Sequence, residues 1–560
     1  MEIKDKIIVK KELENLINQA VKDLSLTESS FSVEHPNDFS HGDYSTNVAM
    51  VLAKETKKNP KELAETIVEK LNANKTDDIE KIEVAGAGFI NFYLTKDFFR
   101  NSIKEIIEKG ESFGKNENLK GEKVIVEYTD PNVMKPFHIG HLMSNAVGES
   151  ISRLIEWNSA HVFRMNYYSD SGLNIAKAVW GVKARLEEIP KESASSSEKS
   201  NFLGSAYAFG VAQFSSNEDI EKEIIDINIK IFNRSDEEIN KIYNLGKRWS
   251  LEHLDELYKR LGTKFDKAIG ESEISEEGRK IVEELLKKGV FEESNGAVVF
   301  HGEKYDPKLH TRVFINNLGL PTYEAKEIGL TYKKFELYQP DISIVITANE
   351  QNDYFKVVLE ALRQVNPKFA EKTKHLSHGM LRLTTGKMSS RTGNVVTAES
   401  LIDEVKEKTE GNEAVAIGAI KYMILRQSIG SDIIFDINQS VSTEGDSGVY
   451  LQYAHARASS LLDKATGIEI AYKERSVVHE VEKLLYRFPE VVERAGREYA
   501  PSHVTTYLTE LASAFNNFYA HEEVIGDSPE SSTRLAIVKG FKTVMKNGLD
   551  VLGIPAPEKM

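Results

Sequence analysis

The chain has 560 residues, 40% of them hydrophobic, which is enough for roughly three or four domains that each bury an apolar core. It contains no cysteine, so disulfides, thiolate nucleophiles and cysteine-ligated zinc or iron–sulfur sites are excluded. The net charge of −15 disfavours non-specific nucleic-acid binding, because phosphate contacts come mainly from clustered Lys and Arg, so any RNA must meet local basic patches.

The first part of the chain predicts a small α+β domain over residues 1–115. Charges interrupt the apolar residues at its start, and no window of the chain approaches about 18 uninterrupted apolar residues, so we expect a cytoplasmic protein without membrane contacts. Apolar residues recur at helical spacing up to about Ala73. Residues 81–94 then alternate around Gly86-Ala87-Gly88, which predicts a hairpin, and the charged stretch 111–122 predicts a linker.

The pattern changes at Lys123 and predicts a catalytic α/β domain over residues 116–400. Residues 124–128 are a short β-branched run, an amphipathic helix is expected from about Pro136 to Trp157, and a second strand follows at 161–168. A strand, a helix and a strand at this spacing form a βαβ unit, so we expect a Rossmann-like parallel sheet.

The remaining sequence predicts an insertion and a third domain. Polar, helix-forming sequence at about 182–297 indicates an inserted domain, after which strand-like segments resume at 298–300 and 342–347. Residues 401–560 follow a helical pattern almost throughout and predict an all-α domain.

The most informative motif runs from Pro131 to Leu142. Pro136 suits the first turn of a helix, which would place His138 and His141 one turn apart near a positive helix end that attracts phosphate. Gly140 leaves room for a planar ring, and Lys135 and the imidazoles can donate to a phosphate during displacement. The simpler interpretation is a capped helix with two surface histidines, but the position of the motif at the first β–α turn argues against it.

A second motif, residues 386–394, places glycines around Lys387, two serines and Arg391. This composition suits a mobile loop that closes a cationic clamp over a polyphosphate, although an isolated loop of this kind is more often an ordinary basic surface loop. It lacks the spacing of a Walker A loop.

Together the two motifs resemble the paired signatures of class I aminoacyl-tRNA synthetases. Within that class, the strings 127–132 and 135–138, and Lys387–Arg391 followed by Gly393-Asn394, resemble the arginyl enzymes. Further similar strings occur along nearly the whole chain, at 41–47, 88–91, 450–457 and 552–555. The resemblance implies a class I Rossmann-like catalytic domain with an inserted domain, a small N-terminal domain that binds the tRNA D-loop, and an all-α anticodon-binding domain.

The resemblance also implies an activity: arginine and ATP with Mg²⁺ form arginyl-adenylate and pyrophosphate, and tRNA(Arg) then accepts the arginine, with tRNA needed for activation. The implied catalytic residues are His138, His141, Lys387 and Lys135. The implied ATP-binding residues are His138, Gly140, His141, Lys387, Met388, Ser389 and Ser390. The implied arginine-binding residues, which suit a guanidinium that has five donors and a fixed charge, are Glu127, Asn132, Tyr323, Glu327 and Gln351. No prosthetic group, no protein metal site and a monomer are expected.

For the tRNA, the resemblance implies D-loop contacts in the N-terminal domain and stacking on anticodon bases in the helical domain. The residues concerned are Phe89, Asn91, Tyr450, Tyr453 and Arg457, with His455 as a further candidate. A packed hairpin aromatic with an amide at its turn explains Phe89 and Asn91 equally well. Because Tyr450, Tyr453 and Arg457 share one helix face, part of that face must also be core.

The sequence departs from the family at several positions, which usually carry Ser at Asp130, Ala at Met134, Arg at Met143, Asp at Glu327 and Lys at Thr392. Lys135 is expected to supply the cation that is missing at Thr392. The rival interpretations are a synthetase for another amino acid, a nucleotidylyltransferase, which would usually be much shorter, and a non-catalytic RNA-binding relative.

Overall fold

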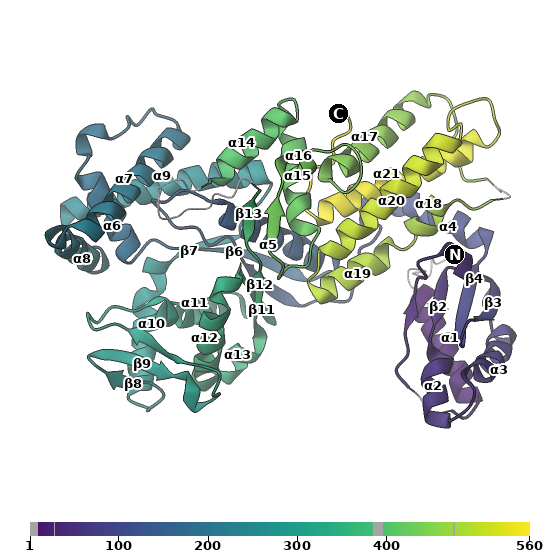
Figure 1. The fold of residues 1–560 in the computed structure, drawn as a ribbon, viewed down its shortest axis with the longest axis horizontal. Helices are drawn as coiled ribbons and strands as arrows, with labels where there is room; N and C mark the ends of the chain where they lie inside the picture. The colour runs from purple at the N-terminus through teal and green to yellow at the C-terminus, as the bar shows by residue number, and fades with distance from the viewer. Residues whose placement is uncertain (1–8, 27–28, 385–395, 474–476) are drawn as a thin grey trace.

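The computed structural model describes residues 9–26, 29–384, 396–473 and 477–560. Its elements form an N-terminal α+β unit, a parallel sheet with helices on both faces, two insertions in that sheet, and a C-terminal helical domain (Figure 1). This architecture confirms the predicted fold class. Within the described residues, no helix is long and apolar enough to cross a membrane.

The N-terminal unit is an antiparallel sheet in the order β1-β2-β4-β3, with helices packed against it. Its elements are α1 (Val9–Asp23), β1 (Val33–Glu34), β2 (Tyr44–Thr46), α2 (Val48–Thr56), α3 (Pro60–Ala73), β3 (Ile79–Ala85) and β4 (Phe89–Leu94). The predicted hairpin is confirmed as β3 and β4. At its turn Gly88 has φ +118°, and a Cβ there would lie 2.9 Å from the carbonyl oxygen of Pro60, so only glycine fits.

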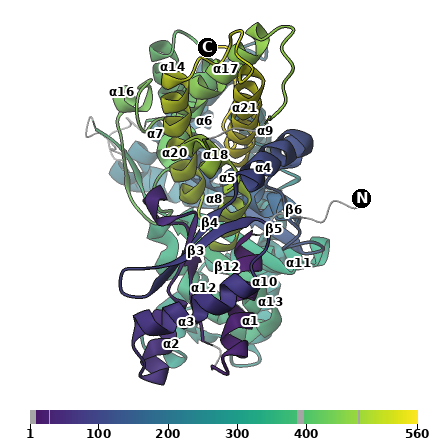
Figure 2. The same cartoon turned by 90° about the vertical axis from the view of Figure 1, so that its right-hand side faces the viewer.

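Helix α4 (Lys96–Lys109) carries the chain out of this unit and packs against α18 (Glu480–Leu485) and α21 (Ser531–Val551) of the helical domain (Figure 2). The side-chain amide of Asn547 donates to the carbonyl oxygens of Gly110 and Phe113, at 3.0 Å each. The segment before the central sheet is therefore fixed to the C-terminal helices.

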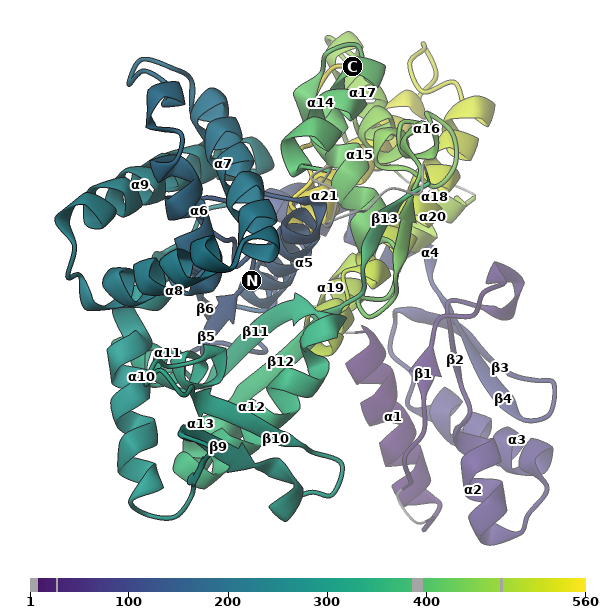
Figure 3. The same cartoon turned by 60° about the vertical axis from the view of Figure 1, so that its left-hand side comes forward.

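The central sheet has five parallel strands in the order β12-β11-β5-β6-β7 (Figure 3). These are β5 (Lys123–Glu127), β6 (His161–Tyr168), β7 (Lys267–Gly270), β11 (Ile342–Ala348) and β12 (Thr373–His378). The chain adds β6 and β7 on one side of β5 and then returns to add β11 and β12 on the other. In sheets of this type, ligands bind beyond the carboxyl ends of the strands at such a switch point, here between β5 and β11.

Helices cover both faces of this sheet. Helix α5 (Ile139–Trp157) shares a core with Val124 and Val126 of β5, whereas α10 (Glu271–Leu286) and α11 (Tyr323–Tyr338) contribute to a core with Ile125 on the other face. The alternation along β5 therefore separates the two faces, as expected for a strand. Helices α12 (Asn352–Val365) and α13 (Pro367–Lys372) connect β11 to β12.

The single insertion predicted at 182–297 is wrong, because β7 lies inside that range and pairs with β6 of the main sheet. One insertion, between β6 and β7, is helical and comprises α6 (Leu173–Lys183), α7 (Ser196–Ser216), α8 (Glu218–Asn233) and α9 (Glu237–Leu261). The other lies between α10 and α11 and is a small antiparallel sheet of β8 (Glu292–Ser294), β9 (Ala297–His301) and β10 (Thr311–Ile315). The strand at 298–300 thus belongs to this small sheet. β7 has only four residues, too few for a recognisable period.

The C-terminal domain is helical, as predicted, and shares one continuous core with α5. Its main helices are α14 (Ala398–Lys408), α15 (Glu413–Leu425), α17 (Gly448–Lys464), α18, α19 (Phe488–Glu498), α20 (Ser502–His521) and α21. A short helix, α16 (Ile437–Ser440), and a parallel pair of strands, β13 (Leu381–Leu383) and β14 (Ile433–Phe435), join it to the catalytic domain. Buried Lys421 of α15 donates to the carbonyl oxygens of Leu261 and Gly553, at 2.7 Å each, which ties α9 to the chain end.

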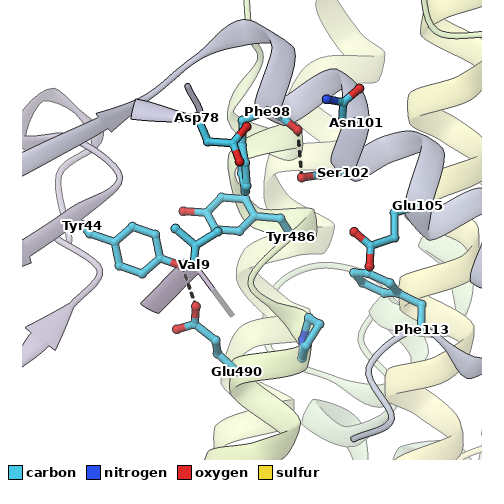
Figure 4. Close-up of a pocket in the computed structure, with 11 residues that line it drawn as sticks. Val9, Tyr44, Asp78, Phe98, Asn101, Ser102, Glu105, Phe113, Tyr486 and Glu490 are labelled. Atoms are coloured by element: carbon cyan, nitrogen blue, oxygen red, sulfur yellow. Dashed lines mark hydrogen bonds between the residues drawn. The ribbon is translucent and has the colours of Figure 1, made fainter. Parts of the chain in front are cut away.

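The N-terminal unit meets the helical domain at a buried polar contact (Figure 4). The hydroxyl of Tyr44 in β2 donates to Glu490 of α19 at 2.5 Å. In addition, Nε2 of His35 lies 3.3 Å from the same carboxylate. Burial alone would raise the pKa of Glu490, but the hydrogen bonds from His35 and Tyr44 outweigh it and lower the pKa. An ionised carboxylate therefore holds the two parts together through charge-assisted hydrogen bonds.

We expect Tyr44→Phe to loosen this contact by about 1–3 kcal/mol, because Glu490 stays buried after losing a donor. Hydrogen exchange measured by mass spectrometry should become faster in β2 and α19. Tyr93→Phe is the matched control, since Tyr93 donates to Glu83 within the N-terminal unit, and it should leave α19 unchanged. Unaltered exchange in β2 and α19 of Tyr44→Phe would contradict this role.

Candidate active site

The segment between β5 and α5 follows the end of β5 and has an unusual backbone. Thr129, Asp130 and Met134 have φ values of +84°, +45° and +58°, a region that non-glycine residues rarely adopt. Hydrogen bonds hold it: Thr129 N donates to Ser144 Oγ at 3.0 Å, and Met134 N donates to Ser250 Oγ at 2.8 Å. Strained backbone of this kind is concentrated at functional sites.

His138 and His141 form a stacked pair at the start of α5, with ring centroids 3.7 Å apart. The helix begins at Ile139, so the prediction that Pro136 lies in its first turn is wrong, and His138 is instead the N-cap. Nδ1 of His138 accepts from Gly140 N at 3.1 Å, and Nδ1 of His141 accepts from His138 N at 3.3 Å. The two imidazoles thus satisfy backbone donors at the start of the helix that have no intrahelical partner.

Hydrogen bonding sets the tautomer of the two histidines, and burial keeps both rings neutral. Because each Nδ1 accepts a backbone N–H, the proton of each neutral ring must be on Nε2, which leaves two N–H donors for a ligand. Burial, with the charge of Lys135, lowers the pKa of His138 to about 4, and burial also holds the pKa of His141 well below its usual value. A Cβ at Gly140 would lie 2.9 Å from Cε1 of His138, so this glycine also accommodates the imidazole.

The positive charge of Lys135 contributes to lowering the pKa of both histidines. Burial, and then the charge of Lys177 in α6, lower its pKa to about 8. Its Nζ lies 4.6 Å from the ring centroid of Tyr207 in α7, so the helical insertion packs beside the histidine pair.

On the other face of the sheet, the three glutamates Glu127, Glu271 and Glu327 form a buried acidic cluster around the end of β5, and Asp130 lies beside it. Glu127, the last residue of β5, is ion-paired with buried Lys334 of α11, whose Nζ lies 4.0 Å from Glu327. Burial raises the pKa of Glu327 to about 7, against the opposing charge of Lys334. Burial and the charge of Glu127 raise the pKa of Asp130 well above its usual value.

Sequence reasoning missed the third carboxylate, Glu271, and its lysine. Glu271 begins α10 and is 2% exposed, and Lys326 Nζ donates to it at 2.7 Å and to Ser171 Oγ at 2.8 Å. The negative charge of Glu271 also contributes to raising the pKa of Glu327. No motif marks these residues, because they come from separate segments that only the fold brings together. The cluster thus combines Glu127, Glu271 and Glu327 with Lys334 and Lys326.

The other predicted arginine-binding residues lie around this edge. Tyr323 begins α11 and is 50% exposed. Its ring centroid lies 5.1 Å from Nζ of Lys326. A cavity of about 390 Å³ adjoins it, lined also by Gly172 and Asn174 of the helical insertion. Asn132 bridges to Ser169 beyond the ends of β5 and β6. Gln351, after β11, is exposed.

The second motif, with Lys387, Met388, Ser389, Ser390, Arg391 and Thr392, lies outside the described residues. Its flanks are described: Thr384 N donates to Phe435 O at 3.2 Å, and after the gap Val396 O accepts from Ile139 N at 3.3 Å. His138 also bridges to Thr397. The chain that follows this motif is therefore joined to the start of α5.

The residues expected to contact tRNA divide into exposed and buried ones. Phe89 on β4 is 42% exposed, whereas Asn91 is buried and its Oδ1 accepts from Ser45 Oγ at 2.7 Å. His455 is fully buried, and its Nδ1 lies 2.9 Å from Pro557 O, so it belongs to the core and does not stack on a base.

An aromatic surface remains on α17 and α20. The guanidinium of Arg457 lies 4.8 Å and 5.1 Å from the ring centroids of Tyr453 and Tyr519. Asn516 joins Arg457 to the hydroxyl of Tyr450, at 2.9 Å in each case. Planar groups of this kind can stack on unpaired bases.

Three family models match the chain and together cover most of it. They are "tRNA synthetases class I (R), catalytic domain" over residues 102–437, "DALR anticodon binding domain" over 451–560, and "Arginyl tRNA synthetase N terminal domain" over 11–94. The arginine--tRNA ligase of Treponema denticola is 32% identical over 94% of this chain and 95% of its own length, and that of Clostridium perfringens is 30% identical over 96% and 97%. The chain belongs to the arginyl-tRNA synthetase family.

Solved structures support the same fold. The Thermus thermophilus arginyl-tRNA synthetase aligns with a TM-score of 0.80 over 99% of this chain and all of its own, at 24% identity. The Plasmodium falciparum arginyl-tRNA synthetase aligns with a TM-score of 0.79 at 20% identity.

Membership of the arginyl-tRNA synthetases carries the activity: the protein is an arginine–tRNA ligase that uses ATP to activate arginine and charges tRNA with it. The predicted family, fold class and enzyme activity are therefore confirmed. Among the described residues, no group of three or more His, Asp or Glu side chains is placed to hold a metal ion.

The family resemblance assigns Glu327 to the arginine site, so the acidic cluster predicts that arginine binding depends on pH. Glu327 takes up a proton as the pH falls through about 7, and the protonated form cannot pair with a guanidinium. Arginine affinity should therefore rise between pH 6 and 8, by up to about tenfold per unit. Isothermal titration calorimetry across this range checks it. Glu327→Gln should bind more weakly and with little pH dependence; a flat profile in the unaltered protein would overturn the assignment.

Proposed function

We propose that this synthetase joins L-arginine to the 3′-terminal adenosine of tRNA(Arg) in two steps at the edge between β5 and β11. A carboxylate oxygen of arginine attacks the α-phosphorus of ATP and the bond to the β-phosphate breaks, which gives arginyl-adenylate and pyrophosphate. A ribose hydroxyl of the tRNA then attacks the adenylate carbonyl, and AMP leaves. The observation that carries this proposal is the placement of neutral imidazole donors and buried carboxylates beside the same switch point.

In this proposal the histidine pair and its surroundings bind ATP. The Nε2–H groups of His138 and His141 donate to phosphate oxygens at the positive end of α5, and Gly140 lies against the nucleotide. Lys135 adds a positive charge at neutral pH, and the family resemblance assigns the same task to Lys387 and the Met388–Ser390 loop. Mg²⁺ enters with ATP as part of the substrate. Stabilisation of the charge that develops at phosphorus needs positioned donors and no general base.

The acidic cluster binds arginine in this proposal. Glu127 and Glu327 pair with the guanidinium, whose flat fork suits carboxylates, and Asn132, Tyr323 and Gln351 complete the contacts. The cavity beside Tyr323 receives the terminal adenosine, which brings its ribose to the adenylate.

The proposed tRNA contacts lie on the exposed aromatic residues of two domains. Phe89, beside Asn91, meets the D-loop, and Tyr450, Tyr453 and Arg457 meet the anticodon. The enzyme acts in the cytoplasm as a monomer, and tRNA must be bound before arginine is activated.

ATP–pyrophosphate exchange tests this function. We expect exchange only when both arginine and tRNA(Arg) are present, because activation needs bound tRNA. The same assay with lysine, which lacks the planar fork, should give no exchange and serves as the control. Exchange with a different amino acid would reassign the substrate, and exchange with arginine alone would remove the tRNA requirement.

Lys135 predicts a second pH effect, opposite in sign to that of Glu327. With its pKa lowered to about 8, Lys135 loses its charge as the pH rises from 7 to 9, so the KM for ATP should increase over this range. Lys135→Arg keeps the charge and should flatten the profile, whereas Lys135→Met should have a high KM throughout.

Lys183→Met is the matched control for Lys135, because Lys183 lies on α6 with its Nζ 3.8 Å from Glu223 and from Glu238, and its loss should leave the KM for ATP unchanged. If Lys135→Met retains the normal KM for ATP at pH 7, Lys135 does not hold the phosphates.

A further inference from the structure

Tyr167 lies near the carboxyl end of β6 and faces the acidic cluster. In the parallel register, Met165 of β6 pairs with Glu127, so the two side chains are on one face, and Tyr167 follows two residues later on that same face. It packs against the core that includes Ile125 and Leu330, which is the side of α10 and α11. The ring therefore extends from the hydrophobic layer towards the edge where arginine is expected to bind.

The hydroxyl of Tyr167 is buried and has no hydrogen-bond partner among the described residues. Other buried tyrosines near the sheet have one: Tyr128 donates to Glu149 at 2.7 Å, and Tyr243 donates to Asp170 at 2.9 Å. A buried polar group without a partner costs about 1–3 kcal/mol, and such a group in a native protein needs an explanation. A ligand that supplies the missing partner is one.

The surroundings indicate which ligand fits. Burial, followed by the negative charges of Glu271 and Glu327, raises the pKa of Tyr167 well above its usual value, so the hydroxyl stays neutral in the field of these carboxylates. The two lysines of the cluster are already engaged, Lys334 with Glu127 and Lys326 with Glu271. The ligand that fits this site is therefore a cation with several N–H donors, which can bridge the carboxylates and also donate to a phenol oxygen.

We propose that Tyr167 is a specificity residue of the arginine pocket, whose hydroxyl oxygen accepts an N–H from the guanidinium of the substrate. This inference rests on the proposed function and adds a contact that no sequence motif marked. Tyr167 is anchored through its backbone as well, because its N–H donates to Asp130 Oδ1 at 3.2 Å. The oxygen is thereby fixed relative to the segment that leads into the histidine pair.

Tyr167→Phe tests the proposal, since it removes the oxygen and keeps the ring. We expect the KM for arginine in pyrophosphate exchange to rise about 10- to 100-fold, the range of a hydrogen bond to a charged group, while the KM for ATP is unchanged. The thermal midpoint of the free enzyme should stay the same or rise, because the deleted hydroxyl has no partner there. Tyr168→Phe is the control: its hydroxyl donates to Glu273 at 3.3 Å, and the KM for arginine should not change.

A second arm locates the contact on the substrate. Desamino-arginine keeps the guanidinium and lacks the α-amino group, so Tyr167→Phe should weaken its inhibition by the same factor as it weakens arginine. An unchanged inhibition constant would place the hydroxyl at the amino group and overturn the proposal. A normal KM for arginine in Tyr167→Phe would also overturn it and leave the proposed function intact, whereas a parent enzyme that does not activate arginine would refute both.

Discussion

The acidic cluster places three carboxylates, Glu127, Glu271 and Glu327, in a space where water does not screen them. Burying like charges together is costly unless cations balance them, and here Lys334 and Lys326 supply two positive charges. The lysines do not compensate fully: burial, with the charges of Glu127 and Glu271, raises the pKa of Glu327 against the opposing charge of Lys334. In the proposed function the guanidinium of arginine is the third cation, and it supplies its charge with donors in a planar fork. Bound there, the substrate would remove part of the electrostatic cost that the fold carries without it.

The two halves of the site have opposite electrostatic character, and the central sheet keeps them apart. The acidic cluster lies on the side of α10 and α11, whereas the histidine pair begins α5 on the other face. Neutral imidazoles suit the half that contains the histidine pair. They donate hydrogen bonds to phosphate without carrying a positive charge that the carboxylates would attract. The strained segment from Thr129 to Met134 connects the two halves, and its hydrogen bonds fix their separation. In the proposed function the reacting carboxylate and phosphorus meet between them.

Local patterns predicted the elements that are long and regular. The strand at 161–168 and the hairpin at 81–94 were found because their period is visible within a few residues. The edge strand β7 was missed because four residues define no period, and the start of α5 was misplaced because a histidine cap has no strong sequence signal. Lys334, Lys326 and Glu271 could not be found from sequence at all. Their role comes from contacts between distant segments, which only the folded sheet brings together.

The effects of two departures from the family, at Glu327 and Asp130, also depend on contacts that only the fold creates. Glu327 keeps the charge of the usual aspartate, and the structure places it in the cluster. Asp130 replaces a usual serine, yet its Oδ1 accepts a backbone N–H from Tyr167 and its pKa is raised, so it adds less negative charge than the sequence suggests. Arginine specificity is therefore compatible with both substitutions.

The proposed requirement for tRNA has a physical route through helix α5. Its first turn carries the histidine pair, while its other end packs against α19 and α21 of the helical domain. Ser150 donates to Val551 O at 3.2 Å along this contact, and Glu490 of the same α19 holds the N-terminal unit. A tRNA that engages the exposed aromatic residues of both outer domains therefore acts on helices that share one core with α5. A shift of that core on tRNA binding would move the phosphate donors, whereas the acidic cluster, on the opposite face of the sheet, would stay in place.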